Sequence, residues 1–185
     1  FGRGVPQDFS QAVAWYRKAA NQGHADAQFS VGHLYSQGHS VPQDLSQAAV
    51  WYLKAADQGH VVAQFNIGMY YEFGQGVPQD FSQAVPWYRK AANQGHADAQ
   101  FKIGYFYSQG YSVPQDYSQA AAWYLKAANQ GQANAQLNIG MLYEFGQGVP
   151  QNIFEAIAWY RNAAQGGFPD AKRHLDRLTF RTSWL

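Results

Sequence analysis

The sequence predicts an all-α fold, a right-handed α/α superhelix built from five tandem helix-turn-helix units of 36 residues each. The string Val-Pro-Gln-Asp begins at Val5 and returns every 36 residues, with Asn replacing Asp in the fifth copy, and the dipeptide Trp-Tyr keeps the same step. Each unit also contains two stretches with apolar residues at helical spacing. Because one helix pair cannot bury both of its faces, neighbouring pairs must stack to form a core.

The second helix of each unit, helix B, is predicted to start after Asp8 and its copies. Asp8-x-x-Gln11 has the pattern of a capping box, in which the acid accepts from a helix N–H and the Gln side chain returns a hydrogen bond. Asn152-x-x-Glu155 is the same device in the fifth unit. Lys18 lies in the last turn, where the helix dipole favours a cation, and Gly23 ends the helix.

The first helix, helix A, is predicted from about His24 to Gln37, with Gly38 at its end. Gly32 lies inside it and recurs in three further copies. A helical glycine costs about 1 kcal/mol relative to alanine, so we expect a neighbouring backbone to approach closely there. Trp15 and Tyr16 of helix B are expected to fill the gap between units.

A longer period of 72 residues overlies the shorter one. Residues 1–72 match residues 73–144 at all but 15 positions, so a helix-pair doublet is the plausible unit of duplication. One difference places Pro86 inside helix B, where the other units have Ala or Val. Proline removes a helix hydrogen bond and clashes with the preceding turn, which predicts a kink near Ser82–Pro86.

The repeats divide the chain into a solenoid over residues 1–178 and a C-terminal tail over 179–185. The first unit is incomplete, because the chain begins in the middle of a repeat. Residues 169–178 align with helix A but are rich in charge, which is typical of a terminal capping helix. The uncapped N-terminal end is a candidate surface for self-association.

The repeat unit resembles the Sel1-like repeat family, which is related to the tetratricopeptide repeat. The resemblance rests on Ala-Asp-Ala-Gln-Phe-x-x-Gly-x-x-Tyr-x-x-Gly, followed by Val-Pro-Gln-Asp-x-x-x-Ala-x-x-Trp-Tyr-x-x-Ala-Ala-x-x-Gly, and covers nearly the whole chain. It implies an α/α superhelix that acts as an adaptor, in bacteria often periplasmic or secreted. Cysteine-rich relatives have been credited with β-lactamase activity, but this chain has no cysteine, so that activity is not carried over.

Composition argues against several classes of function. The net charge of +1 is too small to favour nucleic acid or an anionic membrane surface as partner. No apolar run approaches 18 residues, so membrane insertion is not expected. The absence of cysteine excludes disulfides and thiolate metal sites.

The residues that could carry chemistry have structural explanations. His24, His60 and His96 recur at helix starts, so we interpret them as N-caps rather than metal ligands. Most carboxylates fall at helix caps or in first turns, and only Glu72 and Glu144 lack such an account. We therefore predict no enzymatic activity, no catalytic residue, no metal and no cofactor.

The outward face of the A helices is the remaining candidate site. By analogy with tetratricopeptide repeats it lines the concave side, where a peptide or helix could dock against adaptable Met and anchoring aromatic side chains. The alternative for its Phe row is packing between repeats. The predicted binding residues are Phe29, His33, Phe65, Met69, Phe101, Lys102, Tyr105, Leu137 and Met141.

These observations favour a protein–protein interaction scaffold that binds a protein or peptide partner. Two alternatives remain at the level of sequence. One is an immunity-type inhibitor of a bacterial effector enzyme, and the other, less favoured, is a cell-envelope hydrolase like the cysteine-rich relatives.

Overall fold

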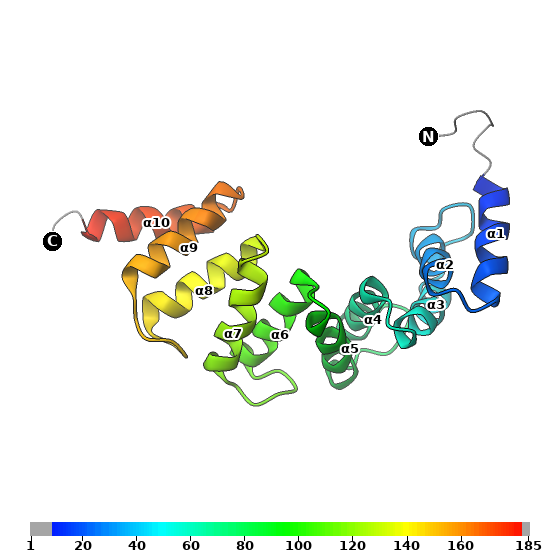
Figure 1. Cartoon of the computed structure of the whole chain (residues 1–185), viewed down its shortest axis with the longest axis horizontal. Coiled ribbons are helices and arrows are strands. Elements are labelled where there is room, and N and C mark those ends of the chain that lie inside the picture. Colours follow the sequence, from blue (N-terminus) through cyan, green and yellow to red (C-terminus); the bar gives the residue numbers. More distant parts are fainter. Residues whose placement is uncertain (1–8, 183–185) are drawn as a thin grey trace. The chain divides into compact units, whose positions relative to one another are not determined.

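The computed structural model describes the backbone of residues 9–182 and the side chains of residues 13–180. The predicted cap Asp8 and residues 183–185 of the predicted tail lie outside these ranges. Ten helices and no strand occur in the described part, joined by short loops (Figure 1). The helices are α1 Phe9–Asn21, α2 Ala25–Gln37, α3 Leu45–Asp57, α4 Val61–Phe73, α5 Phe81–Asn93, α6 Ala97–Gln109, α7 Tyr117–Ala128, α8 Ala133–Phe145, α9 Ile153–Gln165 and α10 Pro169–Thr182.

The even-numbered helices are the predicted A helices and the odd-numbered ones the B helices, so the all-α repeat fold is confirmed. Helix α10 continues to Thr182, four residues beyond the expected end of the capping helix at 178. Residues 179–182 are therefore helical rather than part of a tail.

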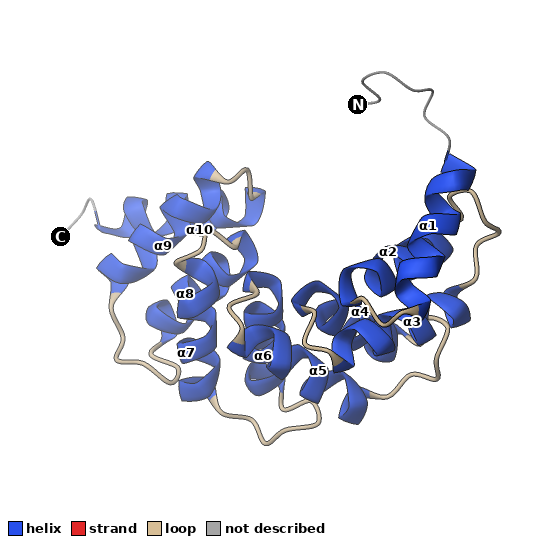
Figure 2. Cartoon of the chain, turned by 45° about the vertical axis from the view of Figure 1, so that its right-hand side comes forward, coloured by secondary structure: helices blue, strands red, loops and turns tan. Residues whose placement is uncertain are grey.

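The chain divides into two compact units, Phe1–Ala91 and Ala92–Leu185. Unit 1 contains α1 to α4 and most of α5, and unit 2 contains α6 to α10. Within each unit the helices follow one another through loops that contain no other regular structure (Figure 2). One continuous right-handed superhelix over residues 1–178 stays a prediction.

The core of each helix pair is a tyrosine of helix B placed against a glycine of helix A. Tyr52 is 2% exposed, and a Cβ added to Gly32 would lie 2.8 Å from its ring. The same contact recurs three times further along the chain, at Gly68–Tyr88, Gly104–Tyr124 and Gly140–Tyr160. A neighbouring backbone does come close to Gly32, as expected, since the Ala48 carbonyl oxygen would be 3.3 Å from an added Cβ, but the tyrosine ring is nearer still.

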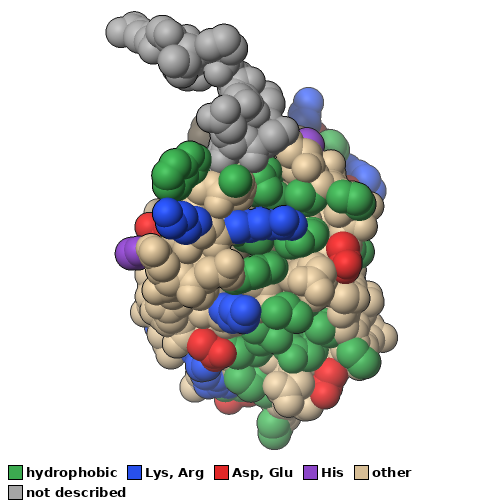
Figure 3. All heavy atoms as spheres, turned by 90° about the vertical axis from the view of Figure 1, so that its right-hand side faces the viewer, with side chains coloured by type: hydrophobic (Ala, Val, Ile, Leu, Met, Phe, Trp, Pro, Cys, Tyr) green, Lys and Arg blue, Asp and Glu red, His purple; other side chains and the backbone are tan. Residues whose placement is uncertain are grey.

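The tryptophans vary in burial: Trp123 is buried, and Trp51, Trp87 and Trp159 pack against the core as partly buried side chains. The expectation that Trp and Tyr fill the gap together therefore holds only in part. Trp15 is 66% exposed and Trp87 is half-buried. The Lys90 ammonium lies 3.8 Å from the centre of the Trp87 ring, a cation–π contact that recurs at Lys54 on Trp51. Lysine and arginine side chains accordingly lie against hydrophobic ones on the face shown in Figure 3.

The Val-Pro-Gln-Asp loops satisfy the backbone at both helix ends that they join. Gln43 donates its side-chain amide to the Ser36 carbonyl at 2.8 Å, near the C-terminus of α2. Asp44 then accepts from the Gln47 N–H at 2.9 Å and caps α3. Later units repeat both contacts. In the last one, Gln151 donates to the Glu144 carbonyl and Asn152 caps α9 in place of an aspartate. The motif thus supplies partners for backbone groups that a helix end leaves unpaired.

Only one half of the predicted capping box forms. The cap carboxylates accept as expected, but the Asp44 N–H donates to the Tyr35 carbonyl at 3.0 Å. The N–H groups of Asp80, Asp116 and Asn152 do the same with the equivalent tyrosines. The backbone N–H of the cap residue therefore already donates to a carbonyl, and it needs no hydrogen bond from the Gln side chain of the box.

Buried glutamines join neighbouring helices. Gln28 is 6% exposed and donates to the Ala20 carbonyl at 3.2 Å, which covers the C-terminal end of α1. Gln58, 30 residues later, donates to the Gln28 side-chain oxygen at 2.7 Å. The same pair recurs in unit 2 as Gln130 and Gln100. The bond to Ala20 links one helix pair to the next, and the glutamine–glutamine bond joins the two helices of a pair.

The loops before α5 and α9 need glycine because two backbones meet there. Gly76 has a φ of +68°, and a Cβ on it would lie 2.2 Å from the Leu45 carbonyl oxygen. A Cβ added to Gly148 would likewise overlap the backbone of Tyr117. The alternate loops instead carry Ser40 at this position, with a φ of +61°.

We predict that Gly76→Ala lowers the free energy of unfolding by about 1–3 kcal/mol more than Gly59→Ala does, as overpacking typically costs. Gly59 has a φ of +90° with nothing within 4 Å of an added Cβ, so its variant reports backbone strain alone. Urea unfolding monitored by circular dichroism measures both. Equal losses would contradict the close backbone contact.

Helix α5 runs without interruption through Pro86, which is exposed. The kink near Ser82–Pro86 stays a prediction. We expect Pro86→Ala to restore a hydrogen bond and to raise the melting temperature, since an interior proline costs up to about 3 kcal/mol. Each kcal/mol corresponds to about 2–4 °C for a chain of this size. Ala122→Pro, at the matching exposed position of α7, should lower the melting temperature; no change in either variant would refute the argument.

The buried tyrosines predict loss of stability in alkali. Burial raises the pKa of Tyr124 to about 12, although its hydrogen bond with Ser108 lowers it. Burial also raises the pKa of Tyr88, and its bond to the Glu72 carboxylate raises it further. The pKa of Tyr124 in the folded chain lies above its unfolded value of 10.0. The stability that its protonated hydroxyl contributes is therefore complete below pH 10 and is lost as the pH rises through 12.

Each such tyrosine should remove about 1.4 kcal/mol of stability per pH unit over this window. Tyr124→Phe should therefore flatten the decline above pH 10, although it loses a buried hydrogen bond at neutral pH. Unfolding free energies measured from pH 7 to 12 provide the check. An equally steep decline in the variant would show that Tyr124 does not contribute.

Candidate functional site

All nine predicted binding residues lie on A helices. We use the term A-helix face for the surface that they and their register equivalents form within each unit. Helices α2 and α4 contribute to it in unit 1, and α6, α8 and α10 contribute in unit 2. The nine are Phe29 and His33 on α2, Phe65 and Met69 on α4, Phe101, Lys102 and Tyr105 on α6, and Leu137 and Met141 on α8.

The Phe row is largely engaged in packing. The Phe29 ring centre lies 5.7 Å from that of Tyr52 and 4.5 Å from that of His60, which caps the next A helix. Phe65 and Phe101 repeat the tyrosine contact at 5.6 and 5.8 Å. All three phenylalanines are half-buried. This geometry supports the alternative reading of the row as helix packing, with one edge left for solvent.

The next row along the A helices contains one exposed side chain. His33 is exposed, and Met69, Tyr105 and Met141 are half-buried. Tyr105 joins an aromatic group, with its ring centre 6.1 Å from that of Tyr111, which is 48% exposed. Four of the nine predicted residues line two hollows, His33 and Met69 in unit 1 and Leu137 and Met141 in unit 2.

The unit 1 hollow has a volume of about 450 Å³ and is polar without being charged. At its base the Tyr52 hydroxyl donates to Ser36 at 3.2 Å, and Tyr70 packs edge-on against the Tyr52 ring. Burial raises the pKa of Tyr70 to about 12, so its hydroxyl stays neutral at physiological pH. The lining residues are His33, Ser36, Gln37, Gln43, Leu45, Tyr52, Asn66, Met69, Tyr70 and Gln75.

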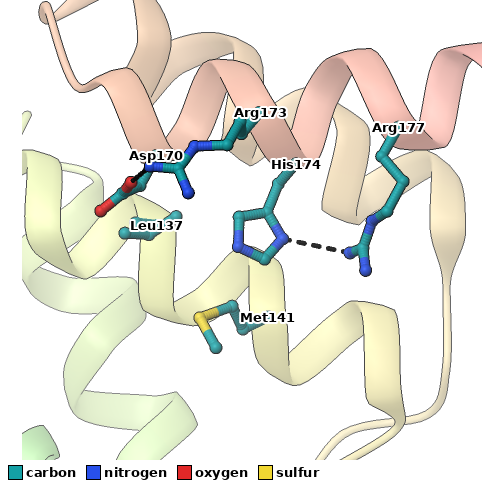
Figure 4. Close-up of a pocket in the computed structure, with 6 residues that line it drawn as sticks. All are labelled: Leu137, Met141, Asp170, Arg173, His174 and Arg177. Atoms are coloured by element: carbon teal, nitrogen blue, oxygen red, sulfur yellow. Dashed lines mark hydrogen bonds and ion pairs between the residues drawn. The ribbon is translucent and has the colours of Figure 1, made fainter.

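The unit 2 hollow, of about 470 Å³, lies between α8 and α10 (Figure 4). Leu137 and Met141 of α8 form one side. Helix α10 supplies the other side with four polar or charged residues, Asp170, Arg173, His174 and Arg177. This hollow therefore combines an apolar side with a predominantly basic one.

Helix α10 is attached beside this hollow through a buried carboxylate. Glu144 is 5% exposed and accepts from the Tyr160 hydroxyl at 2.8 Å and from the Arg177 guanidinium. Nδ1 of His174 lies 3.6 Å from the same carboxylate, and its ring stacks on Tyr160 with centres 4.9 Å apart. Hydrogen bonds and opposite charge offset the desolvation of Glu144.

Comparison with known proteins places this repeat in a family. The family model of the Sel1 repeat matches residues 1–24, 25–60, 61–96, 97–132 and 133–168. The chain belongs to the Sel1 repeat family. Its predicted Sel1-like character is thereby confirmed. No curated protein sequence matches the chain.

Two solved structures are similar over most of this Sel1 repeat chain. One, a protective antigen of uropathogenic Escherichia coli strains displaying an SLR fold, is 38% identical with a TM-score of 0.89 over 94% of this chain. A Sel1 repeat protein from Oxalobacter formigenes is 41% identical with a TM-score of 0.85, again over 94%. This chain spans 37% and 50% of the lengths of those two chains.

A more distant Sel1 relative is an immunity protein from Pseudomonas aeruginosa, 24% identical with a TM-score of 0.53 over 91% of this chain and 62% of that one. At that identity the likeness shows the fold alone. Sel1 repeat proteins are compatible with a role as protein-binding scaffolds, and the family is generally non-enzymatic.

The charged residues of α10 were missed as site residues, although a signal for them was present. Adding one repeat length of 36 to the face positions of α8 takes Leu137 to Arg173 and Met141 to Arg177. The sequence pattern by itself indicates only a polar cap for these arginines. In this Sel1 repeat chain they also extend the A-helix face into the last helix.

The histidines behave largely as helix caps. His60 and His96 accept from the N–H groups of Ala63 and Ala99 through Nδ1, whereas His24 occupies the same position without a side-chain cap bond. Among the described residues, no three His, Cys, Asp or Glu side chains come together as a metal site would require. In that same part of the chain, no helix has the length and apolar character of a membrane span.

Proposed function

We propose that this Sel1 repeat chain is a protein-binding scaffold whose A-helix faces hold a peptide or helix of a partner protein. The observation that carries the proposal is the position of the two hollows. Both open beside the row predicted from sequence, at His33 and Met69 in unit 1 and at Met141 in unit 2. Concave sites lined by apolar and polar groups are the usual places for ligand contacts.

The two 72-residue halves differ more in their A helices than in their B helices. Eight of the 15 differing positions lie in A helices and four in B helices, although each half has two helices of each kind. Position 33 is His in one half and Tyr105 in the other, while the Gly and Tyr core positions are identical. Three of the eight A-helix differences are at packed positions, namely Val31/Ile103, Leu34/Phe106 and Tyr70/Leu142. Met69 and Met141 are identical, so within the predicted row only position 33 differs between the halves.

The side chains on this face suit a peptide ligand. Met69 and Met141 are flexible and polarisable, so they can adapt to different apolar side chains. Tyr105 is a large, half-buried aromatic that can act as an anchor at an interface. The predicted binding residues that pack internally, Phe29, Phe65 and Phe101, would support such a site from below, and Lys102 would add a charge beside it.

An inhibitor of an effector enzyme would be one form of this scaffold, and it remains a prediction. The hydrolase alternative gains no specific support, because the unusual carboxylates, Glu72 and Glu144, hold tyrosine hydroxyls in the core. Self-association through the N-terminal end also stays a prediction.

We predict that Met69→Ala combined with Tyr105→Ala weakens partner binding at least tenfold, which corresponds to about 1.4 kcal/mol. The helical circular dichroism and melting curve should change little, since both side chains are only half-buried. The probe is a fluorescein-labelled peptide selected from displayed random-sequence peptides on the wild-type chain, with its Kd measured by fluorescence polarisation.

The matched core variant is Tyr88→Ala. Its side chain is fully buried, so it should destabilise the fold by about 3–5 kcal/mol. Trp87 would be a poorer choice because it is half-exposed. Normal peptide binding by the double variant would refute the A-helix face as the site, and a large drop in its melting temperature would show that the two side chains belong to the core.

A further inference from the structure

Positive charge on the A-helix face is concentrated at one place. Helices α2, α4 and α8 contain no lysine or arginine, and α6 contains only Lys102. Helix α10, in contrast, contains Lys172, Arg173 and Arg177 within its described side chains, and the two arginines line the unit 2 hollow. A ligand at this hollow therefore meets a different electrostatic environment from one at the uncharged hollow of unit 1.

Arg173 is available for a ligand. Its side chain is 82% exposed, and one guanidinium nitrogen contacts Asp170 at 2.7 Å. A guanidinium has five N–H donors in a planar fork, so a single contact leaves donors for a second carboxylate. Its side chain extends over the hollow beside Leu137 (Figure 4).

His174 offers a second donor. Its Nδ1 lies 3.1 Å from the Arg177 guanidinium. The same Nδ1 lies 3.6 Å from the Glu144 carboxylate, so this nitrogen faces the groups that hold α10, and Nε2 is the ring nitrogen presented to a ligand. Figure 4 shows this second nitrogen turned away from Arg177, toward the side of the hollow where Leu137 and Met141 lie.

The acidic groups nearby do not cancel this arrangement. Glu144 is buried, and its oxygens already accept from Tyr160 and Arg177. Asp170 is the one acidic residue that lines the hollow, and it is 62% exposed. Asp170 therefore takes up one contact of Arg173, and the other guanidinium donors and the His174 ring line the hollow opposite Leu137 and Met141.

We infer that the hollow between α8 and α10 binds an acidic peptide segment, in which an apolar side chain packs on Leu137 and Met141 and a neighbouring carboxylate accepts from Arg173 and His174. This inference rests on the proposed scaffold function and names the partner's chemistry. An apolar surface beside paired donors fits a peptide better than single-stranded nucleic acid, whose bases need aromatic platforms for stacking.

The test uses random-sequence peptides displayed and selected on the full chain. Wild-type protein should enrich peptides with Asp or Glu next to an aliphatic or aromatic residue. The best peptide, labelled with fluorescein, should bind Arg173→Glu at least tenfold more weakly in fluorescence polarisation. Its affinity for wild type should also fall as salt is raised, because the contact is exposed.

Lys172→Glu is the matched control. It makes the same change of charge on the neighbouring residue of α10, which is exposed but does not line the hollow. Its effect should stay below about threefold, since screened surface charges contribute little. Replacing the peptide's acid by the amide should weaken binding to wild type but not to Arg173→Glu.

The outcomes separate the two proposals. If selected peptides are neutral, bind Arg173→Glu normally and lose binding to the Met69 and Tyr105 double variant, the scaffold stands and the acidic site is wrong. If equal losses occur in Arg173→Glu and Lys172→Glu, the hollow is not the site. If no peptide binds, or if a single-stranded oligonucleotide binds more tightly than any peptide, both proposals fail.

Discussion

Each complete helix pair depends on a tyrosine ring that lies where a glycine has no side chain. The ring of Tyr52, Tyr88, Tyr124 or Tyr160 comes so near to the A helix that an added Cβ would be 2.7–2.8 Å from it. Such a contact brings the two helices close together and buries a large aromatic surface. Other contacts depend on these tyrosines. The Phe row packs on the same rings, and the tyrosine hydroxyls hydrogen-bond to Ser or Glu side chains. Helix α10 has Asp176 at the position that glycine occupies in the other A helices.

A chain with only 14% charged residues must satisfy its buried polar groups mainly by neutral hydrogen bonds. Glutamine does much of this. Gln28 and its copies cover the ends of B helices, and Gln43 and its copies cover the ends of A helices. Among the described side chains, no buried nitrogen or oxygen lacks a partner. Because these bonds are specific to position, they set the register of the helices where apolar packing alone would allow sliding.

In the proposed scaffold, specificity would come from the side chains that border the two hollows. The tyrosines, glycines and glutamines of the core leave the outer row of the A helices free to differ. In unit 1 this row borders a hollow of neutral hydroxyls and amides, and in unit 2 it borders one with arginines. One repeat fold thus presents two chemically distinct surfaces. A protein that binds a partner at both hollows can discriminate between partners by charge at one hollow and by neutral hydrogen bonding at the other.

The sequence by itself determined the period, the helix boundaries and most caps of this protein, because these depend on local spacing and on residues such as Asp44 and Gly38 at helix ends. It also placed the predicted binding residues on the A helices, although the Phe row expected to face outward packs on the tyrosine rings. Only the tertiary structure decided between adjacent residues such as Trp87 and Tyr88, which look equally suited to a core but lie on different sides of one helix. The ion pair between Glu144 and Arg177 also could not be predicted from the sequence. Its two residues lie on different helices, and the distance between them depends on how α10 packs. Contacts between helices, unlike caps and periods, are a property of packing, and no short stretch of sequence contains them.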